Sequence, residues 1–352
     1  MTVATALPAI MRAMAIDRYA GPEAIAVRTL PVPAAGPGEV LVKMAAVGVN
    51  PADWKACAGF LPFLPDSFLP LVPGFDGTGT IVALGEGVNE LAVGDRIAFM
   101  SGLPLGRGGT WSDYAVCPAA HAARLPDSLS FAEAATIPVP GISPREALDQ
   151  GGVKAAERVL VNGGSGGTGV WAIQIACAAG ARVAATAGPA NQDLLRALGV
   201  ECAIDYRGED VAARIDAWAP GGVDLLLDTV GQRSLADPAA LVRPGGRYVA
   251  IETMLPGEAL PDVASFVAKH VTAIRASASF PRLGEHLKAL VEAVGAGTMA
   301  VPPVETLPLE DAATAMARVR TGHVRGKIVL MVDQDQYQPS AADTRVTMKD
   351  FA

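Results

Sequence analysis

Residues 159–176 read VLVNGGSGGTGVWAIQIA and place a glycine-rich turn between a strand-like run and a helix-like run. Gly164, Gly166 and Gly169 within it have the spacing GxGxxG. Such a turn requires a positive φ, its middle glycine lets backbone approach a pyrophosphate, and its last glycine lets the helix pack on the strand. The amino end of the helix then offers free N–H groups and its dipole to phosphate oxygens. The segment therefore predicts the first βαβ unit of a dinucleotide-binding domain.

The chain around this turn alternates between strand-like and helix-like segments. Helical patterns are expected in GTGVWAIQIACAAG, NQDLLRALG, EDVAARIDAWA, SLADPAALV and DVASFVAKH. The apolar runs between them are ERVLVNG, ARVAATAG, ECAIDY, VDLLLDTV, GGRYVAIE and VTAIRASA. Short strands that are apolar on both sides and separated by helices are typical of a parallel sheet covered on both faces. The sequence thus predicts an α/β fold with a doubly wound parallel-sheet (Rossmann) domain over residues 140–280.

Residues 1–139, which precede this region, have a different sequence pattern. They consist of β-rich runs broken by Pro and Gly. The predicted strands lie in MRAMAI, EVLVKMAAVGV, GTGTIVALG, DRIAFM and WSDYAVC, as expected for a β-rich domain with few helices. After residue 280 a helix is expected in RLGEHLKALVEAVGAG, and PVETLPLEDAATAMARVRTG and GKIVLMV add a helix and a last strand. We assign residues 281–332 to a return to the first domain and residues 333–352 to a flexible tail.

Composition excludes several classes of protein. The 28 basic and 36 acidic residues give a net charge of −8, and no block of Lys or Arg interrupts the chain, so a nucleic-acid partner is not expected. No apolar run reaches the roughly eighteen residues of a membrane span, and the first residues lack the pattern of a signal peptide. Cys57, Cys117, Cys177 and Cys202 form no CxxC pair, which argues against a disulfide scaffold. We expect a cytoplasmic protein without membrane contact.

A rival interpretation uses the same glycine-rich residues. Ser165 lies at the centre of a GxSxG pattern, which is the nucleophile elbow of serine hydrolases. The acid and base of such a hydrolase would come from Asp228, His270, His286 or His323. No HGGG-like oxyanion segment lies upstream, and the additional glycines have no purpose in an elbow. A serine hydrolase remains the alternative to a nucleotide-dependent enzyme, together with a non-enzymatic NADPH-binding protein.

The end of the second Rossmann strand indicates the type of cofactor. NAD-type sites usually place an acid there to hold the ribose hydroxyls. This chain has Ala185, Thr186, Ala187 and Gly188 instead, and no Asp or Glu occurs between Glu157 and Asp193. The carboxylate that would repel a 2′-phosphate is therefore missing, which favours NADPH. The polar residues nearest to this position in the sequence are Asn191, Arg196, Tyr206 and Arg207.

The whole chain, from about Met11 to Val332, resembles the medium-chain dehydrogenase/reductase superfamily, and within it the quinone oxidoreductase (zeta-crystallin-like) and enoyl reductase branch. Besides the glycine-rich turn, the segments that carry the resemblance are GPEAIAVRTLPVPAAGPGEVLVKMAAVGVNPADWK, VPGFDGTGTIVALGEGV, VGDRIAFM, GTWSDYAV, LPDSLSFAEAATIPVPG, LDTVG and GHVRGKIVL. The resemblance implies a GroES-like substrate domain, with NADPH-dependent reduction of an activated C=C bond or a quinone in a small hydrophobic substrate. It also implies a homodimer, with VTAIRASA as the edge strand that pairs across a two-fold axis.

The resemblance also locates the site. Zinc-dependent relatives carry a Cys and a His–Glu pair at the positions of Asn50, Phe75 and Asp76, so we expect a metal-free site. Asn50 and Asp53 are the implied catalytic residues, although an Asn-Pro turn and a helix cap would also explain them. The aromatic residues that would form the wall of a substrate pocket, or part of the core, are Trp54, Phe60, Trp111 and Tyr114. The implied cofactor-binding residues are Ser143, Gly163, Gly164, Ser165, Gly166, Gly167, Thr168, Gly169, Thr186, Ala187, Gly188, Asn191, Tyr206, Val230, Gly231 and Lys327.

The chain departs from its relatives in two segments. Ser143-Pro144-Arg145 stands where relatives have Thr-Ala, so contacts near the nicotinamide are expected to differ. Residues 250–253, Ala-Ile-Glu-Thr, replace the Gly-Lys-Thr-Asp stretch of enoyl reductase domains, which removes a lysine proposed there as proton donor. From the sequence we place no His or Lys as the acid. We expect the amide of Asn50 and backbone N–H groups to stabilise the charge that develops on the substrate oxygen.

Overall fold

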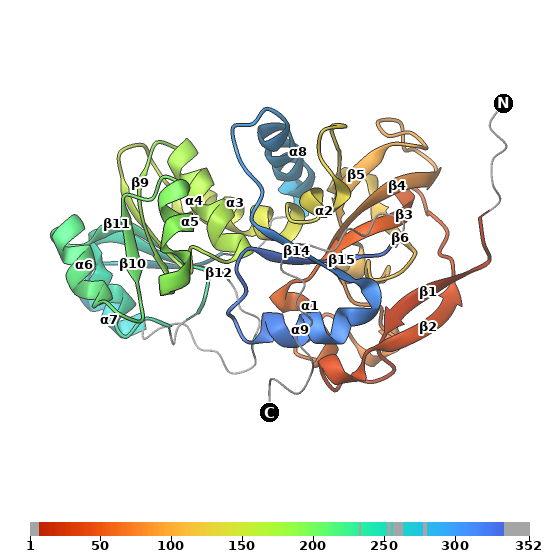
Figure 1. Cartoon of the computed structure of the whole chain (residues 1–352), viewed down its shortest axis with the longest axis horizontal. Coiled ribbons are helices and arrows are strands. Elements are labelled where there is room, and N and C mark those ends of the chain that lie inside the picture. Colours follow the sequence, from red (N-terminus) through yellow and green to blue (C-terminus); the bar gives the residue numbers. More distant parts are fainter. Residues whose placement is uncertain (1–6, 232–233, 252–254, 256–262, 277–279, 334–352) are drawn as a thin grey trace.

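The computed structural model describes residues 7–231, 234–251, 255, 263–276 and 280–333. The predicted tail from residue 334, Glu252-Thr253 and the end of VTAIRASA lie outside the described residues. The chain forms two domains side by side, with the last helices and strands between them (Figure 1). In the described part of the chain, no helix has the length and apolar character needed to cross a bilayer.

A six-stranded parallel sheet forms the second domain, with strand order β10-β9-β8-β11-β12-β13. This order is the 3-2-1-4-5-6 arrangement of the Rossmann fold, and all six predicted strands are confirmed. The sheet's edge strands are β10 and β13, which agrees with the position predicted for VTAIRASA. The strands are β8 (Arg158–Asn162), β9 (Arg182–Ala187), β10 (Cys202–Asp205), β11 (Val223–Asp228), β12 (Val242–Ile251) and β13 (Thr272–Ala276).

Helices cover both faces of this sheet, and each face has its own apolar core. The helices are α3 (Pro138–Gly151), α4 (Gly167–Ala178), α5 (Gln192–Ala197), α6 (Val211–Trp218) and α7 (Val263–Ala268). Trp171 of α4 and Leu148 of α3 belong to one core, whereas Ile215 of α6 and Phe266 of α7 belong to the other. The helix predicted in SLADPAALV is wrong, because only a 3₁₀ turn, η7 (Pro238–Leu241), forms before the chain enters β12.

The first domain is built on a seven-stranded sheet in which β14, β15, β3, β4, β5 and β7 follow one another and β6 also pairs with β3. β15 runs antiparallel to β3, so the chain returns to the first sheet at its end. The short helices are α1 (Pro51–Cys57) and α2 (Phe131–Ala134). The sheet strands are β3 (Glu39–Gly48), β4 (Asp76–Leu84), β5 (Arg96–Met100), β6 (Tyr114–Pro118), β7 (Ala122–Arg124), β14 (Val304–Pro308) and β15 (Lys327–Met331).

Three strands were not predicted. β2 (Ala26–Pro31) forms a separate hairpin with β1 (Ile10–Ala15), and its residues lie partly or fully exposed along its length. β7 has only three residues, and β14 ends at a proline and carries a charged residue. None of the three has the apolar alternation by which a half-buried strand is recognised.

Of the last two helices, one contacts both domains and the other packs on the first. The apolar face of α8 (Leu283–Gly295) joins the core of the nucleotide domain through Leu287 and Leu290. A Cβ atom at Gly284 would lie only 1.9 Å from the backbone oxygen of Ala120, so α8 also touches the first domain. α9 (Ala312–Arg320) contributes Ala315 and Met316 to the core of the first domain. The predicted return of the chain to the first domain, from residue 281, therefore begins with a helix that contacts both domains.

Candidate active site

The glycine-rich turn has the geometry of a phosphate cradle. Gly166 precedes α4 with φ of −76°, and in the described part of the chain no side chain caps this helix. A Cβ atom on Gly166 would meet only the Gly163 oxygen, at 3.8 Å, so the space beside it is open. A Cβ atom on Gly169 would lie 2.1 Å from the same oxygen, so this glycine is needed for packing of α4 on the turn. These residues fit a bound dinucleotide in the roles predicted for them.

A second wall comes from the loop after β11. Gly163 has φ of +87°, and a Cβ atom on it would lie 2.5 Å from Cγ2 of Val230 and 2.7 Å from Oγ1 of Thr229. The side chain of Val230 is 53% exposed although it is apolar, and Gly231 has φ of +118°. The structure therefore brings the predicted residues Val230 and Gly231 to the glycine-rich turn.

A third wall comes from the first domain. The N–H of Gly326 donates to the Ser165 oxygen at 2.8 Å. A Cβ atom on Gly167 would lie 3.2 Å from the Gly326 oxygen and 3.5 Å from Cδ of Lys327. The start of β15 thus touches the turn, and Lys327 lies beside it as predicted.

On the side of β9, the residues expected near a 2′-phosphate come together in part. A Cβ atom on Gly188 would lie 4.0 Å from both Nε of Arg207 and Cε1 of Tyr206. Nδ2 of Asn191 donates to Oγ of Ser165 at 3.2 Å, which ties this residue to the turn. Arg196 is engaged elsewhere, since its guanidinium lies 2.5 Å from Oδ1 of Asp193. Arg207 and Tyr206 are therefore the better candidates for contact with a 2′-phosphate.

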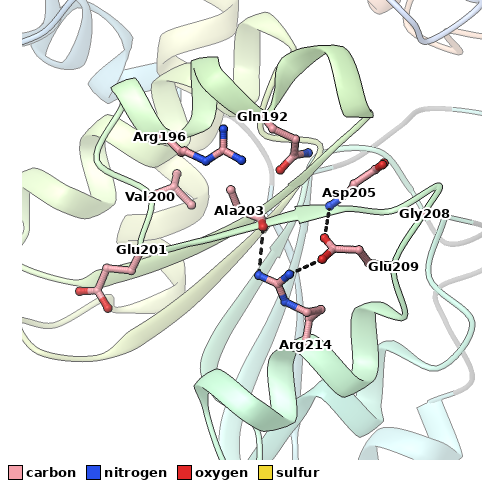
Figure 2. A pocket seen from close by; sticks show the side chains of 9 residues that line it. All are labelled: Gln192, Arg196, Val200, Glu201, Ala203, Asp205, Gly208, Glu209 and Arg214. Atoms are coloured by element: carbon pink, nitrogen blue, oxygen red, sulfur yellow. Dashed lines mark hydrogen bonds and ion pairs between the residues drawn. The ribbon is translucent and has the colours of Figure 1, made fainter.

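A hollow of about 620 Å³ lies away from this site. It lies outside the edge strand β10 and is polar (Figure 2). Arg214 donates to the Ala203 oxygen at 3.3 Å and pairs with Glu209, whose carboxylate accepts from the Asp205 N–H at 2.8 Å. These side chains cover backbone groups at the free edge of the sheet, a common protection against pairing with another chain.

Three predicted cofactor residues support the site from beneath and present no free side chain to a ligand. Thr186 is only 1% exposed, and its hydroxyl accepts from the Gly163 N–H at 3.0 Å and donates to Oδ1 of Asn162 at 2.7 Å. Ala187 is buried. The hydroxyl of Ser143 donates to the Val139 oxygen within α3 at 2.8 Å. Thr186 therefore holds the turn in place from within the sheet.

A buried polar centre lies where the domains meet. Lys327 is 5% exposed, and its Nζ donates to Oδ1 of Asn50 and to the Val49 oxygen, the latter at 2.8 Å. Nδ2 of Asn50 donates to Oδ1 of Asp76 at 2.9 Å. Both ends of the Asn50 amide are thus engaged, while its nitrogen carries a second N–H, and donation from this amide to a substrate stays a prediction. Lys327, which the sequence placed only among the cofactor-binding residues, is thus the amine held at this centre.

Asp76 connects this centre to the nucleotide domain. Its Oδ2 accepts from the Val139 N–H at 3.0 Å, in the first turn of α3, where the helix dipole favours a carboxylate. A Cβ atom on Gly48 would lie 2.7 Å from Oδ1 of Asp76 and 3.1 Å from Cε of Lys327, so only glycine leaves room for this arrangement. Asp76 therefore fixes both Asn50 and the start of α3.

Asp53 has the capping role that was the alternative to catalysis. Its carboxylate accepts from the Asn50 N–H at 2.6 Å and from the Phe75 N–H at 3.2 Å, and the residue is fully buried. Burial and then the charge of Asp76 raise the pKa of Asp53 to about 7. Burial also raises the pKa of Asp76 and lowers the pKa of Lys327, although the two carboxylates oppose that lowering. Asp53 thus holds the backbone around Asn50.

The same centre does not fit a zinc ion. The positions of the relatives' ligands hold an amide, an apolar ring and a carboxylate, at Asn50, Phe75 and Asp76. Zinc sites use thiolate, imidazole and carboxylate ligands, and the ammonium of Lys327 lies against this set. Within the described residues, no group of three or more His, Cys, Asp or Glu side chains is placed to hold a metal.

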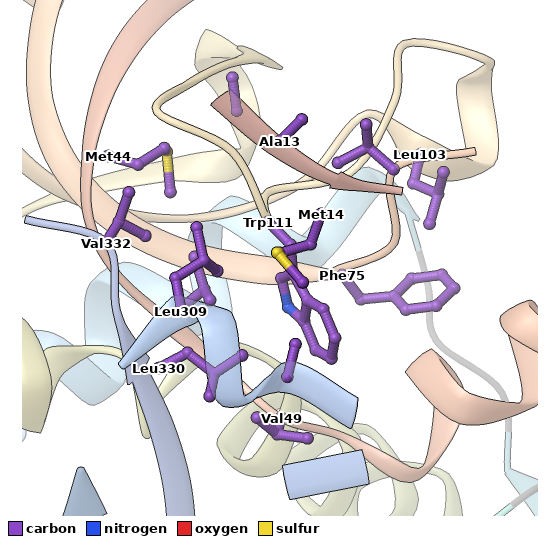
Figure 3. Close-up of a cluster of buried hydrophobic side chains, with 14 of the residues drawn as sticks. Ala13, Met14, Met44, Val49, Phe75, Leu103, Trp111, Leu309, Leu330 and Val332 are labelled. Atoms are coloured by element: carbon purple, nitrogen blue, oxygen red, sulfur yellow. The ribbon is translucent and has the colours of Figure 1, made fainter. Parts of the chain in front are cut away.

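The predicted pocket aromatics separate into two groups. The rings of Trp54 and Phe60 lie 6.0 Å apart, edge to face, and the Arg320 guanidinium lies 5.5 Å from the centre of the Trp54 ring. Trp111 is fully buried in the core of the first domain, beside Phe75, so its assignment to a pocket is wrong (Figure 3). Tyr114 pairs with Lys43 on β3, which places it far along that strand from Gly48, about 17 Å at ~3.3 Å per residue. Only Trp54 and Phe60 remain candidates for the pocket.

The geometry offers no hydrolase triad. Oγ of Ser165 accepts from Asn191, and no histidine or acid of the described chain hydrogen-bonds to it. Nε2 of His286 lies 3.1 Å from Oε1 of Glu146 in the buried contact between α8 and α3. The sequence suggested Asp228 only as the acid of a hydrolase. In the structure its carboxylate accepts hydrogen bonds from Asn162 and Tyr248 beneath the site. Asn162 and Asp228 were missed as site residues, although each is a polar residue that ends an apolar strand.

The fold and the site together define a two-domain, nucleotide-dependent dehydrogenase or reductase. Residues 36–127 match the family described as alcohol dehydrogenase GroES-like domain, and residues 198–330 match zinc-binding dehydrogenase. The chain is 30% identical over 331 residues to quinone-oxidoreductase QR1, chloroplastic, of Triphysaria versicolor, and the match covers 91% of this chain and 98% of that protein. The chain belongs to the medium-chain dehydrogenase/reductase superfamily, whose oxidoreductases use a nicotinamide cofactor.

Two further comparisons agree with this assignment. The structure of the quinone oxidoreductase from Coxiella burnetii superposes with a TM-score of 0.81 at 28% identity, over 92% of this chain and 100% of that one. The synaptic vesicle membrane protein VAT-1 homolog of Rattus norvegicus is 32% identical over 243 residues, or 68% of this chain. The match spans only 58% of the length of that relative.

Proposed function

We propose that this protein is an NADPH-dependent, zinc-independent reductase of an activated C=C bond (in an enone, enal or enoyl thioester) or of a quinone. The observation that carries the proposal is the contact between the Lys327–Asn50–Asp76 centre and the glycine-rich turn. In this proposal the Lys327 ammonium takes the place of the metal that zinc-dependent relatives hold at the positions of Asn50, Phe75 and Asp76. The similarity to quinone oxidoreductases supports the same class of substrate.

A bound nicotinamide cofactor supplies the hydride for such a reduction. The chain must then stabilise the negative charge that develops on the substrate oxygen. Lys327 has one N–H of its ammonium left over after its bonds to Asn50 and Val49, and this N–H is suited to that oxygen. Burial lowers the pKa of Lys327, which makes its ammonium a stronger acid for protonating the product. Asn50 and the Val49 oxygen hold Nζ in place, and Asp76 orients Asn50, so that little reorganisation of these groups is needed when the charge develops.

The preference for NADPH is part of the proposal. No carboxylate follows β9, and the Arg207 guanidinium lies next to Gly188, with the Tyr206 ring beside it. Arg207 donates to the Tyr206 hydroxyl at 3.3 Å. An arginine beside an aromatic ring is well suited to a ribose 2′-phosphate.

We expect Arg207→Ala to weaken NADPH binding by about tenfold, the effect of losing roughly 1.4 kcal/mol from one exposed charge-assisted contact. Binding of NADH should change little, since it has no 2′-phosphate. In the parent protein, Gly188→Asp should shift the preference from NADPH toward NADH, because the new carboxylate repels that phosphate. Fluorescence titration with both cofactors measures this. Equal losses for NADPH and NADH, or a parent protein that binds NADH more tightly, would contradict the assignment.

The assembly and location of the enzyme are also proposals. β13 lies at an open edge of the nucleotide-domain sheet, and Val263 and Val267 on the neighbouring helix α7 are 53% and 67% exposed. An open strand edge next to exposed apolar side chains supports a homodimer through this face. All four cysteines are free, which supports a reducing compartment such as the cytoplasm.

A broad acceptor screen tests the proposed chemistry. Loss of NADPH absorbance is followed with quinones, enones, enals and enoyl thioesters, and we expect turnover with at least one of these classes. NADPH binding without oxidation by any acceptor would favour a non-enzymatic binding protein. Ester hydrolysis that Ser165→Ala abolishes, in a protein that fails to bind NADPH, would instead establish the hydrolase.

A further inference from the structure

Asp228 is the centre of a buried hydrogen-bond network at the carboxyl end of the nucleotide-domain sheet. The residue is 1% exposed and ends β11. Its Oδ2 accepts from the Tyr248 hydroxyl at 2.9 Å, and its Oδ1 accepts from Nδ2 of Asn162 at 2.8 Å. The same Oδ1 accepts from the N–H groups of Val230 at 3.0 Å and Gly231 at 3.1 Å. One carboxylate therefore binds the last residue of β8, a tyrosine of β12 and the loop that follows its own strand.

Through Asn162 this network also reaches the glycine-rich turn. Oδ1 of Asn162 accepts from the Thr186 hydroxyl, which accepts in turn from the Gly163 N–H. The Thr229 hydroxyl donates to the Asn162 backbone oxygen at 2.7 Å. The two walls of the cofactor groove, the turn and the Thr229–Gly231 loop, are thus joined from beneath by buried polar groups.

The position of this loop in the sheet indicates which half of the cofactor it faces. A dinucleotide lies across the point where the strand order reverses, and its adenosine half lies over the end of the second strand, here β9. β11 lies on the opposite side of β8. The Thr229–Gly231 loop therefore belongs to the nicotinamide side, where the exposed side chain of Val230 offers an apolar wall to the ring.

We propose that Asp228 is a positioning residue for the nicotinamide half of the cofactor. Its carboxylate fixes the Val230 and Gly231 N–H groups and so sets the wall against which the nicotinamide lies. This inference rests on the proposed NADPH-dependent function. Asp228 should then affect binding of the nicotinamide half of the cofactor only. A residue needed merely for folding would affect binding of both halves.

The test compares Asp228→Ala with Tyr248→Phe in the full-length protein. Both variants remove hydrogen bonds from the same buried carboxylate, but only Asp228→Ala releases the loop. We expect Asp228→Ala to weaken NADPH binding by about 10- to 100-fold, as calorimetry would measure it. Binding of 2′,5′-ADP, which contains only the adenosine half, should stay within about threefold of the parent. Tyr248→Phe should lower the melting temperature and leave both affinities within the same limit.

Equal losses for NADPH and 2′,5′-ADP, or equal effects of the two substitutions, would overturn the positioning role. Should Asp228→Ala fail to fold, Asp228→Asn carries the test, since a neutral amide makes weaker bonds to the loop N–H groups. A selective loss of NADPH affinity of about three- to tenfold is then expected, and parent-like affinity would refute the inference. Failure of the parent protein to bind NADPH would refute the proposed function itself, which distinguishes the two outcomes.

Discussion

Gly166→Val is expected to abolish cofactor binding without unfolding the protein. A Cβ atom at this position meets nothing closer than the Gly163 oxygen at 3.8 Å, and φ of −76° with ψ of 165° is extended backbone that valine adopts readily. The isopropyl group would instead fill the space that a pyrophosphate needs above the amino end of α4. We expect NADPH affinity to fall at least about 100-fold, measured by fluorescence titration, with little change in melting temperature.

The matched control is Gly169→Val in the same turn. Its Cβ atom would lie 2.1 Å from the Gly163 oxygen and 2.7 Å from Cα of Gly164, so this substitution should destabilise the fold itself. The two glycines thus separate the ligand side of the turn from its packing side. A Gly166→Val protein that binds NADPH like the parent would place the phosphates elsewhere.

Lys327→Met is expected to lower turnover by about 100- to 1,000-fold, the usual effect of removing one preorganised donor from the developing oxyanion. Methionine keeps much of the volume of the lysine stem but removes the ammonium that binds Asn50 and the Val49 oxygen. Because Asp76 and Asn50 then lack their cation, some loss of stability is expected as well. Single-turnover kinetics at saturating NADPH measures the chemical step separately from cofactor binding.

Lys43→Met is a suitable control for this experiment. Lys43 is exposed on β3 of the same sheet, so the same change in charge and side chain occurs away from the site. Parent-like turnover is expected for this variant. A Lys327→Met enzyme with parent-like single-turnover rates would show that the buried ammonium takes no part in the chemistry.

The nucleotide domain could be predicted from the sequence because its signals are local. Six apolar runs, the glycine spacing and the missing acid after Ala187 each depend on neighbours in the chain. The structure confirms the strands, and it leaves open space beside Gly166 and close packing at Gly169. The helix predicted in SLADPAALV does not form, which shows that a local sequence pattern alone does not decide the structure. Asp237 and Pro238 start a helical turn, but the chain then enters β12.

The polar centre could not be predicted in the same way, because it depends on contacts between distant segments. Asn50 and Lys327 are bonded although nearly the whole chain separates them, and neither residue's neighbours indicate the other. The family resemblance implied a catalytic Asn50 and a cofactor-binding Lys327 but no contact between them, so the Asn50 amide was expected to act with backbone N–H groups alone. Trp111 was misplaced for a similar reason, since an aromatic residue in a β-rich segment fits a core as well as a pocket.

In the proposed function Lys327, held by Asn50 and the Val49 oxygen, replaces the metal of the zinc-dependent relatives. This replacement is tested most directly by the turnover of protein treated with a strong chelator, together with its zinc content by elemental analysis. We expect no stoichiometric zinc and NADPH-dependent turnover that the chelator leaves unchanged. About one zinc per chain, with activity that is lost on chelation and restored by added zinc, would contradict it.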